Sequence, residues 1–111
     1  MTEINPESVY RQHLETGQDW AEKQAAYQLL DDVTKSIKSA EMMAAKQAES
    51  CAMNEAEAIA LSSSAYRDHL QSVAEARTAA LKAKVRFDSI KVLWEARRTL
   101  EASERAAMRA G

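Results

Sequence analysis

The chain has 111 residues but only two Gly and one Pro, whereas a sheet protein needs turns rich in such residues every ~8–12 positions. Alanine is the commonest residue, with 22 copies, and Glu, Lys, Arg, Gln, Leu and Met supply most of the rest. These residues lose the least free energy on entering a helix. The sequence therefore predicts an all-α fold. A single cysteine argues against a disulfide framework and against a cysteine-built zinc site.

The apolar residues do not form a segment long enough to span a membrane. No apolar run approaches the ~18 residues of a membrane span, and no basic-then-apolar leader is recognised. We therefore expect a soluble, cytoplasmic protein without a membrane partner. The hydrophobic share of 46% is inflated by alanine, and only six residues are aromatic. Because methyl groups bury little area, the helices should pack closely and a second subunit should supply further buried area.

Residues 1–18 predict a short N-terminal helix and turn. Asn5 and Pro6 indicate an N-cap followed by proline at the first helical position. Gly17 is typical of the residue that ends a helix. Asp19, with Glu22 three residues later, then indicates the capping box of the next helix.

Residues 19–111 predict a helical hairpin with arms of about 19–53 and 64–108. The apolar and small residues of each arm recur at spacings of three, four or seven, as on one face of a helix. On the first arm they are Trp20, Tyr27, Leu30, Val33, Ile37, Ala40, Ala44, Ala48 and Cys51. On the last arm they are Tyr66, Leu70, Val73, Ala76, Ala80, Ala83, Phe87, Ile90 and Trp94. The last arm is long enough, at roughly 67 Å, to predict a coiled coil.

The connection over 54–63 is expected to reverse the chain. Asn54 would cap a brief helical turn that runs to Leu61, and Ser63 would cap the last arm. Arms joined in this way run antiparallel. A turn centred near residues 58–59 predicts these opposing pairs: Ile37 with Ala80, Leu30 with Phe87, Tyr27 with Ile90, Ala44 with Val73, and Trp20 with Trp94.

A second apolar line on the last arm is left uncovered by the first arm. This apolar line consists of Ala74, Leu81, Val85 and Val92. Since exposed apolar surface favours association, we expect a homodimer or higher oligomer, with two hairpins forming a four-helix bundle. Leu81, Val85 and Val92 are the candidate oligomer-interface residues.

Charge is divided unevenly along the chain. Residues 1–61 have a net charge of −6 and residues 62–111 a net charge of +4. In the second part five cations recur every seven residues and form a basic line: Arg77, Lys84, Lys91, Arg98 and Arg105. One interpretation is a contact surface for nucleic-acid phosphates or for a partner. The favoured interpretation is a flank of the seam, paired with Asp31, Asp32 and Glu41. The net charge of −2 and the interleaved Glu95, Glu101 and Glu104 argue against strong nucleic-acid binding, and no exposed aromatic is expected beside the line.

No constellation of residues predicts catalysis. His13 and His69 lie on separate elements without metal-ligand spacing, and we expect both on solvated helix faces. Cys51 is expected to be a buried thiol. The run Ser62–Ser64 lacks a neighbouring base and indicates a turn. We therefore expect no enzyme, no catalytic residue, no cofactor, no metal and no small-molecule substrate.

Three segments carry a resemblance to a family of small alanine-rich helical proteins of phages and prophages. They are YQLLDDVTKSI from Tyr27, the connection from Asn54-Glu-Ala-Glu-Ala to Ser63-Ser-Ala-Tyr66, and WEARRTLEA from Trp94. The resemblance covers residues 21–109, about four fifths of the chain. Ser64 departs from it, since proline is expected there. Members are often encoded near phage recombination and single-strand DNA handling genes, which implies a location in the bacterial host cytoplasm.

Two classes of function follow. The favoured one is a non-enzymatic accessory protein, an oligomeric helical hairpin that acts beside DNA recombination or replication machinery by binding a phage or host protein. The alternatives are a direct nucleic-acid binder, which would bind weakly through the basic line, and an inhibitor of a host defence complex. The sequence favours the interaction protein because of its uncovered apolar line.

Overall fold

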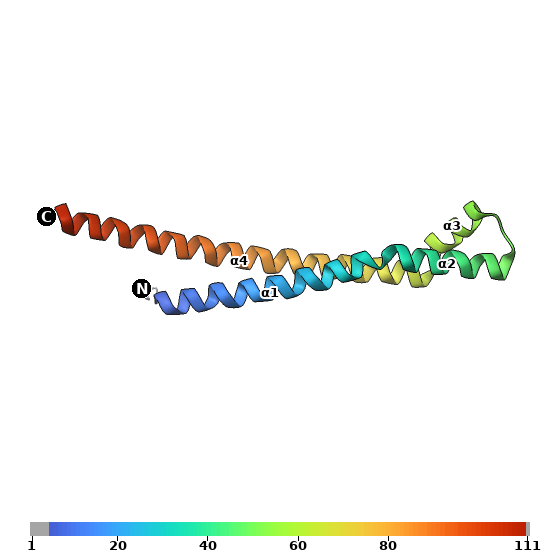
Figure 1. Ribbon diagram of the computed structural model, residues 1–111, viewed down its shortest axis with the longest axis horizontal. Helices are drawn as coiled ribbons and strands as arrows, with labels where there is room; N and C mark the ends of the chain where they lie inside the picture. Colours follow the sequence, from blue (N-terminus) through green and yellow to red (C-terminus); the bar gives the residue numbers. More distant parts are fainter. Residues whose placement is uncertain (1–4, 111) are drawn as a thin grey trace. The chain divides into compact units, whose positions relative to one another are not determined.

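The computed structural model describes residues 5–110, which form four α-helices and no strand. In chain order they are α1 (Pro6–Asp32), α2 (Thr34–Glu49), α3 (Met53–Ser62) and α4 (Ser64–Ala110), as Figure 1 shows. The prediction of an all-α fold is confirmed. Within this part of the chain, none of the helices combines the length and the apolar character that crossing a membrane requires.

The chain divides into two compact units. The first unit contains the residues up to Glu22 together with those from Leu81 onward, and the second contains Lys23–Ala80. α1 and α4 each contribute residues to both units. The predicted division into 1–18 and 19–111 therefore differs from the grouping in the structure.

α1 begins at the predicted cap and then continues beyond its predicted end. The backbone N–H of Glu7 donates to Oδ1 of Asn5 at 3.0 Å, which confirms the cap. The helix runs through Gly17 and Asp19 without a break, so the predicted helix end and capping box are wrong. A Cβ atom at position 17 would lie 3.2 Å from Cε2 of Phe87. Gly17 therefore provides room for a packed ring and does not end the helix.

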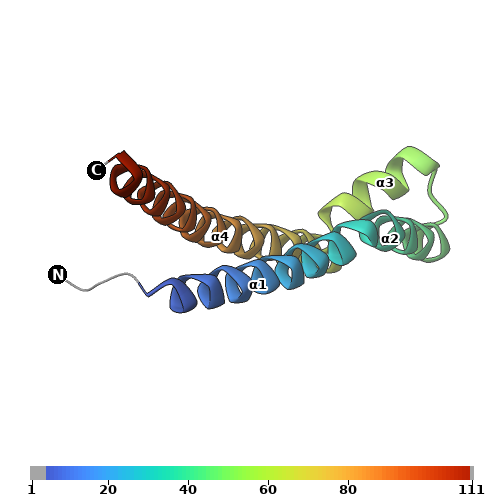
Figure 2. The same ribbon diagram turned by 60° about the vertical axis from the view of Figure 1, so that its left-hand side comes forward.

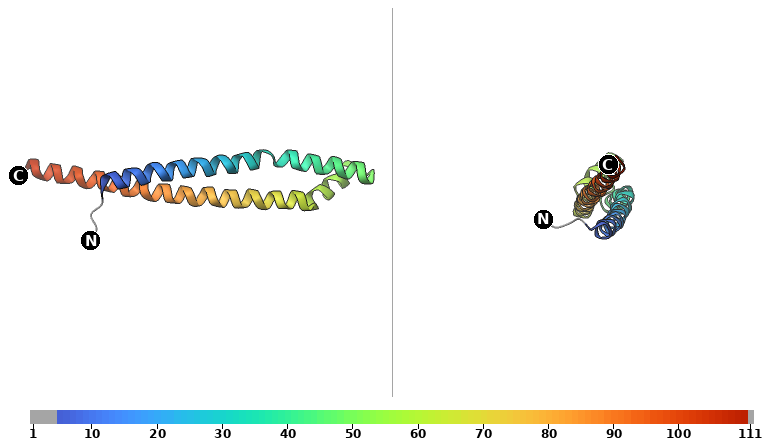
Figure 3. Two further views of the ribbon diagram at one scale, coloured as in Figure 1. Left: turned by 90° about the horizontal axis from the view of Figure 1, so that it is seen from below. Right: turned by 90° about the vertical axis from the view of Figure 1, so that its left-hand side faces the viewer.

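In the first unit, the start of α1 runs antiparallel to the middle of α4, and the end of α4 extends beyond it, as the left view of Figure 3 shows. The ring of Phe87 stacks on His13 and on Trp20, with centroid distances of 4.9 and 5.4 Å. Trp94 packs against Tyr10 at 5.9 Å. The predicted pairing of Trp20 with Trp94 is therefore wrong, because Trp20 lies nearer the start of α4.

The second unit contains the chain reversal. Val33 interrupts the first arm between α1 and α2, and Ser50 ends α2 in the left-handed region, with φ of 49°. α3 then folds back along α2, as Figure 2 shows. The connection predicted to contain a brief helical turn from Asn54 to Leu61 forms the helix α3 over Met53–Ser62. The reversal over 50–52 precedes the predicted centre at 58–59, and this shift displaces the whole predicted register.

Small residues form the contact between α2 and α3. Ala56 and Ala60 are fully buried and Ala45 is 6% exposed, whereas the predicted seam residue Ala44 is exposed. Across this contact Nζ of Lys38 donates to Oε1 of Glu57 at 2.9 Å. The hydrogen bond to Glu57, and then its negative charge, raise the pKa of Lys38 above its usual value. Close helix packing through alanine is therefore observed, on a different face from the predicted one.

Of the two caps predicted for α3 and α4, the structure contains only the one for α4 among the described residues. Asn54 does not cap α3, which begins after Ala52 without a side-chain cap; its Oδ1 accepts the N–H of Glu55 at 3.0 Å. Ser63 does cap α4, because its Oγ accepts the backbone N–H of Tyr66 at 3.2 Å. The prediction for Ser63 is confirmed.

Replacing Ser63 with alanine is expected to lower the free energy of unfolding by about 1 kcal/mol, because the first turn of α4 loses an acceptor for its backbone N–H. Ser64→Ala is the matched control, since Ser64 is an exposed helical residue beside the cap. Urea unfolding followed by circular dichroism measures both. Equal losses for the two variants would contradict the assignment of the cap.

Candidate interaction surfaces

The apolar line lies on α4 and is exposed in the single chain. Leu81, Val85 and Val92 are 54, 64 and 64% exposed. Ala83, on the same turns of the helix, is fully buried against the rest of the first unit. Leu100, which is 52% exposed, extends the exposed apolar character toward the end of the helix. α4 therefore has a packed face and a second, uncovered apolar face.

The basic line also lies on α4, with Arg77 in the second unit and the other four residues in the first. None of the five forms an ion pair with a carboxylate among residues 5–110. Two carboxylates of the first unit engage other arginines: Asp19 accepts from Arg86 at 3.1 Å, and Glu101 accepts from Arg97 at 3.1 Å. Among residues 5–110 the five cations of the basic line are therefore exposed and outside any ion pair, although Glu95 and Glu101 lie near Arg98 and Arg105.

The predicted partners of the basic line are engaged elsewhere or lie apart from it. Asp32 accepts a hydrogen bond from Nε2 of Gln28 at 2.9 Å, and neither Asp31 nor Glu41 forms an ion pair within the described chain. The interpretation of the line as a set of seam pairs with Asp31, Asp32 and Glu41 is therefore wrong. Its physical cause is the displaced register, which opposes α4 to other residues.

Aromatic side chains lie beside the basic line. Nζ of Lys84 is 6.0 Å from the centroid of the Trp20 ring, within the range of a cation–π contact. Trp94 is a helical neighbour of both Lys91 and Arg98, three and four residues away. Tyr10, whose ring packs on Trp94, is 52% exposed. The half-buried Trp20 and Trp94 therefore lie beside cations of the basic line, and the exposed Tyr10 packs on Trp94.

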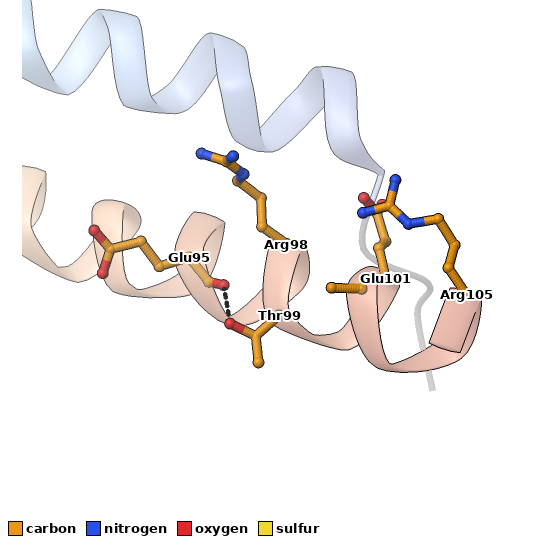
Figure 4. A pocket seen from close by; sticks show the side chains of 6 residues that line it. Glu95, Arg98, Thr99, Glu101 and Arg105 are labelled. Carbon is orange, nitrogen blue, oxygen red and sulfur yellow. Dashed lines mark hydrogen bonds between the residues drawn. The ribbon is translucent and has the colours of Figure 1, made fainter. Parts of the chain in front are cut away.

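A shallow, open depression lies at the end of the basic line on α4. It is lined by Glu95, Arg98, Thr99, Glu101, Ala102 and Arg105, and Figure 4 shows Arg98 and Arg105 rising from the same side of the helix. Oγ1 of Thr99 donates to the backbone carbonyl of Glu95 at 3.0 Å. The wall contains two guanidinium groups and two carboxylates, so it is a polar surface feature without a nucleophile–base pair.

The histidines and the cysteine are placed differently from expectation. His69 is 9% exposed, and its Nε2 lies 2.9 Å from Oγ1 of Thr34, so it belongs to the core of the second unit. His13 stacks on Phe87, and its buried Nδ1 has no hydrogen-bond partner. Cys51 is half-buried, 3.9 Å from the carbonyl oxygen of Ala45. Over residues 5–110 no group of three or more His, Cys, Asp or Glu is placed to hold a metal ion.

Comparison of the sequence with protein-family models, with curated proteins and of the structure with solved structures finds no match.

Proposed function

We propose that this chain is a non-enzymatic interaction protein that associates first with a second copy of itself. The observation that carries the proposal is the exposure of the apolar line, in which Leu81, Val85 and Val92 remain 54–64% exposed. Burying a Val or Leu side chain contributes about 1.5–3 kcal/mol. Two copies that bring these faces of α4 together would complete a four-helix bundle.

The biological setting proposed for this oligomer is that of a phage accessory protein. The resemblance in the segments that begin at Tyr27, Asn54 and Trp94 supports a role in the bacterial cytoplasm beside DNA recombination or replication machinery. In this setting the oligomer docks on a phage or host protein. Inhibition of a host defence complex is the other docking role that suits the same helical surface, and affinity purification from an infected host separates the two.

Replacing Leu81 and Val85 together with glutamate is expected to convert a dimer into a monomer, because four carboxylates would meet across the interface. Light scattering after size-exclusion chromatography, at about 50 µM protein, measures the mass. Leu29→Glu with Met43→Glu is the matched control, since these residues are 67 and 63% exposed and lie off α4. A monomeric unmodified protein, or a control that dissociates equally, would contradict the proposal.

A further inference from the structure

We infer that one edge of the first unit binds single-stranded nucleic acid. This basic–aromatic edge consists of Tyr10 on α1 and of Lys84, Lys91 and Arg98 on α4, all within the first unit. The inference goes beyond self-association and does not depend on it, because these residues are distinct from Leu81, Val85 and Val92.

The charge of the edge is available to a ligand. The three cations of the edge form no ion pair among residues 5–110, although Asp88 and Glu95 lie three or four residues from them on α4. Cations spaced seven residues apart on a helix follow one another at about 10.5 Å. A polyanion with a flexible backbone can adjust to that spacing, and each phosphate contact releases bound counterions.

The aromatic component distinguishes this edge from a purely electrostatic surface. Tyr10 is 52% exposed while its ring is held against Trp94 at 5.9 Å. A ring fixed in this way offers a face on which a base can stack at little further entropic cost. Base–aromatic stacking beside cations is the usual arrangement in proteins that bind single strands without sequence preference.

The same feature favours a single strand over a duplex. The bases of a duplex are stacked on each other, and an exposed tyrosine outside a groove cannot reach their faces. A single strand, whose bases are unstacked, can instead place a base on the exposed Tyr10 ring. A single strand laid along α4 from Lys84 to Arg105 would follow about 32 Å of helix.

Two carboxylates moderate the affinity at the end of the edge. Glu95 and Glu101 line the depression that also contains Arg98 and Arg105, and Glu101 is bonded to Arg97. Phosphates that approach Arg98 and Arg105 therefore meet nearby negative charge. We expect affinity in the micromolar range at 50 mM salt.

The test is fluorescence anisotropy of a labelled 20-nucleotide oligo(dT) with the full chain, between 50 and 200 mM NaCl. Three to four phosphate contacts to a single strand give a slope of about −2 to −3 in log affinity against log salt. The Kd should therefore increase roughly 20- to 50-fold over this range. A 20-base-pair duplex should bind several-fold more weakly at every salt concentration.

Variants separate the two components of the edge. Lys91→Gln with Arg98→Gln should reduce the slope by about 1.4, since each lost phosphate contact removes about 0.7. Tyr10→Ala should weaken binding about fivefold or more without changing the slope, because stacking is lost while the phosphate contacts remain. Tyr10→Phe should restore the affinity.

The control variant is Lys46→Gln with Arg67→Gln, which removes two exposed cations of the second unit and should leave the Kd unchanged. Circular dichroism verifies that each variant is folded.

Several outcomes would overturn the inference. Absence of binding at 50 mM salt would remove it outright. Equal binding of duplex and single strand, together with an inert Tyr10→Ala, would show a non-specific polyanion surface. Poly-glutamate binding as tightly as oligo(dT) would identify an acidic protein as the partner class. A monomeric protein that binds oligo(dT) as described would sustain the inference although the proposed self-association had failed.

Discussion

Replacing Ala80 with leucine is expected to lower the free energy of unfolding by about 1–3 kcal/mol, because three added carbon atoms force closely packed helices apart. Ala80 is 2% exposed on α4, so its methyl group is enclosed by the surrounding residues. Ala44→Leu is the matched control, since Ala44 is exposed on α2, and a surface substitution changes stability by no more than about 0.5 kcal/mol.

Urea unfolding at one protein concentration for all variants measures both changes, since association would otherwise alter the apparent stability. Leucine at position 80 should move the midpoint to lower urea without altering the slope of the transition. The description of α4 as closely packed at Ala80 fails if Ala80→Leu is neutral. The assignment of the packed face of α2 fails if Ala44→Leu is as harmful as Ala80→Leu.

Caps could be predicted from the sequence because their chemistry is local. Asn5 before Pro6, and Ser63 before α4, each place a side-chain acceptor within reach of an N–H two or three residues later. No distant residue is needed for these bonds. The helical conformation of α4 and the position of its apolar face could be predicted for a similar reason. Phe87, Ile90 and Trp94 follow one another at spacings of three and four residues, as on one face of a helix.

The turn and the register could not be predicted because they depend on distant contacts. Ser50 adopts a left-handed conformation that glycine or asparagine usually signals, so nothing in its identity marks a reversal. Gly17 resembles a helix end by itself, whereas its space is occupied by Phe87 of α4. Ala44 was predicted on the packed face because it continues the three- and four-residue spacing of the first arm, whereas α2 begins after an interruption at Val33 and buries Ala45.

The candidate surfaces likewise combine local features that could be predicted with contacts between distant residues that could not. The basic line was visible as a seven-residue period, and the apolar line as surplus apolar residues on one helix. The partners of the cations were assigned through the wrong register, which placed Asp31, Asp32 and Glu41 opposite them. Tyr10 was missed because its relation to Trp94 requires the observed register. A tyrosine on the first turns of α1, among polar neighbours, was the available signal.

Replacing Phe87 with alanine is expected to lower the free energy of unfolding by roughly 3 kcal/mol, the lower part of the range for such truncations because the ring is half-buried. The loss includes the stacking on His13 and Trp20, at centroid distances of 4.9 and 5.4 Å. Leu93→Ala is the control on the same helix, since Leu93 is 36% exposed and joins none of the ring contacts of this unit. A smaller loss for Phe87→Ala than for Leu93→Ala would show that this ring cluster does not hold the first unit together.

Gly17→Ala tests whether the ring of Phe87 is the reason for glycine inside α1. Alanine in a helix interior is favoured over glycine by about 1 kcal/mol, yet a Cβ at position 17 would lie 3.2 Å from Cε2 of Phe87. In the unmodified protein these effects should nearly cancel. In a Phe87→Ala background the ring is absent, so Gly17→Ala should stabilise by the full ~1 kcal/mol. The coupling energy from this double-mutant cycle should therefore be about 1 kcal/mol. Additive changes would show that the ring leaves enough room for a methyl group, and that another cause retains Gly17.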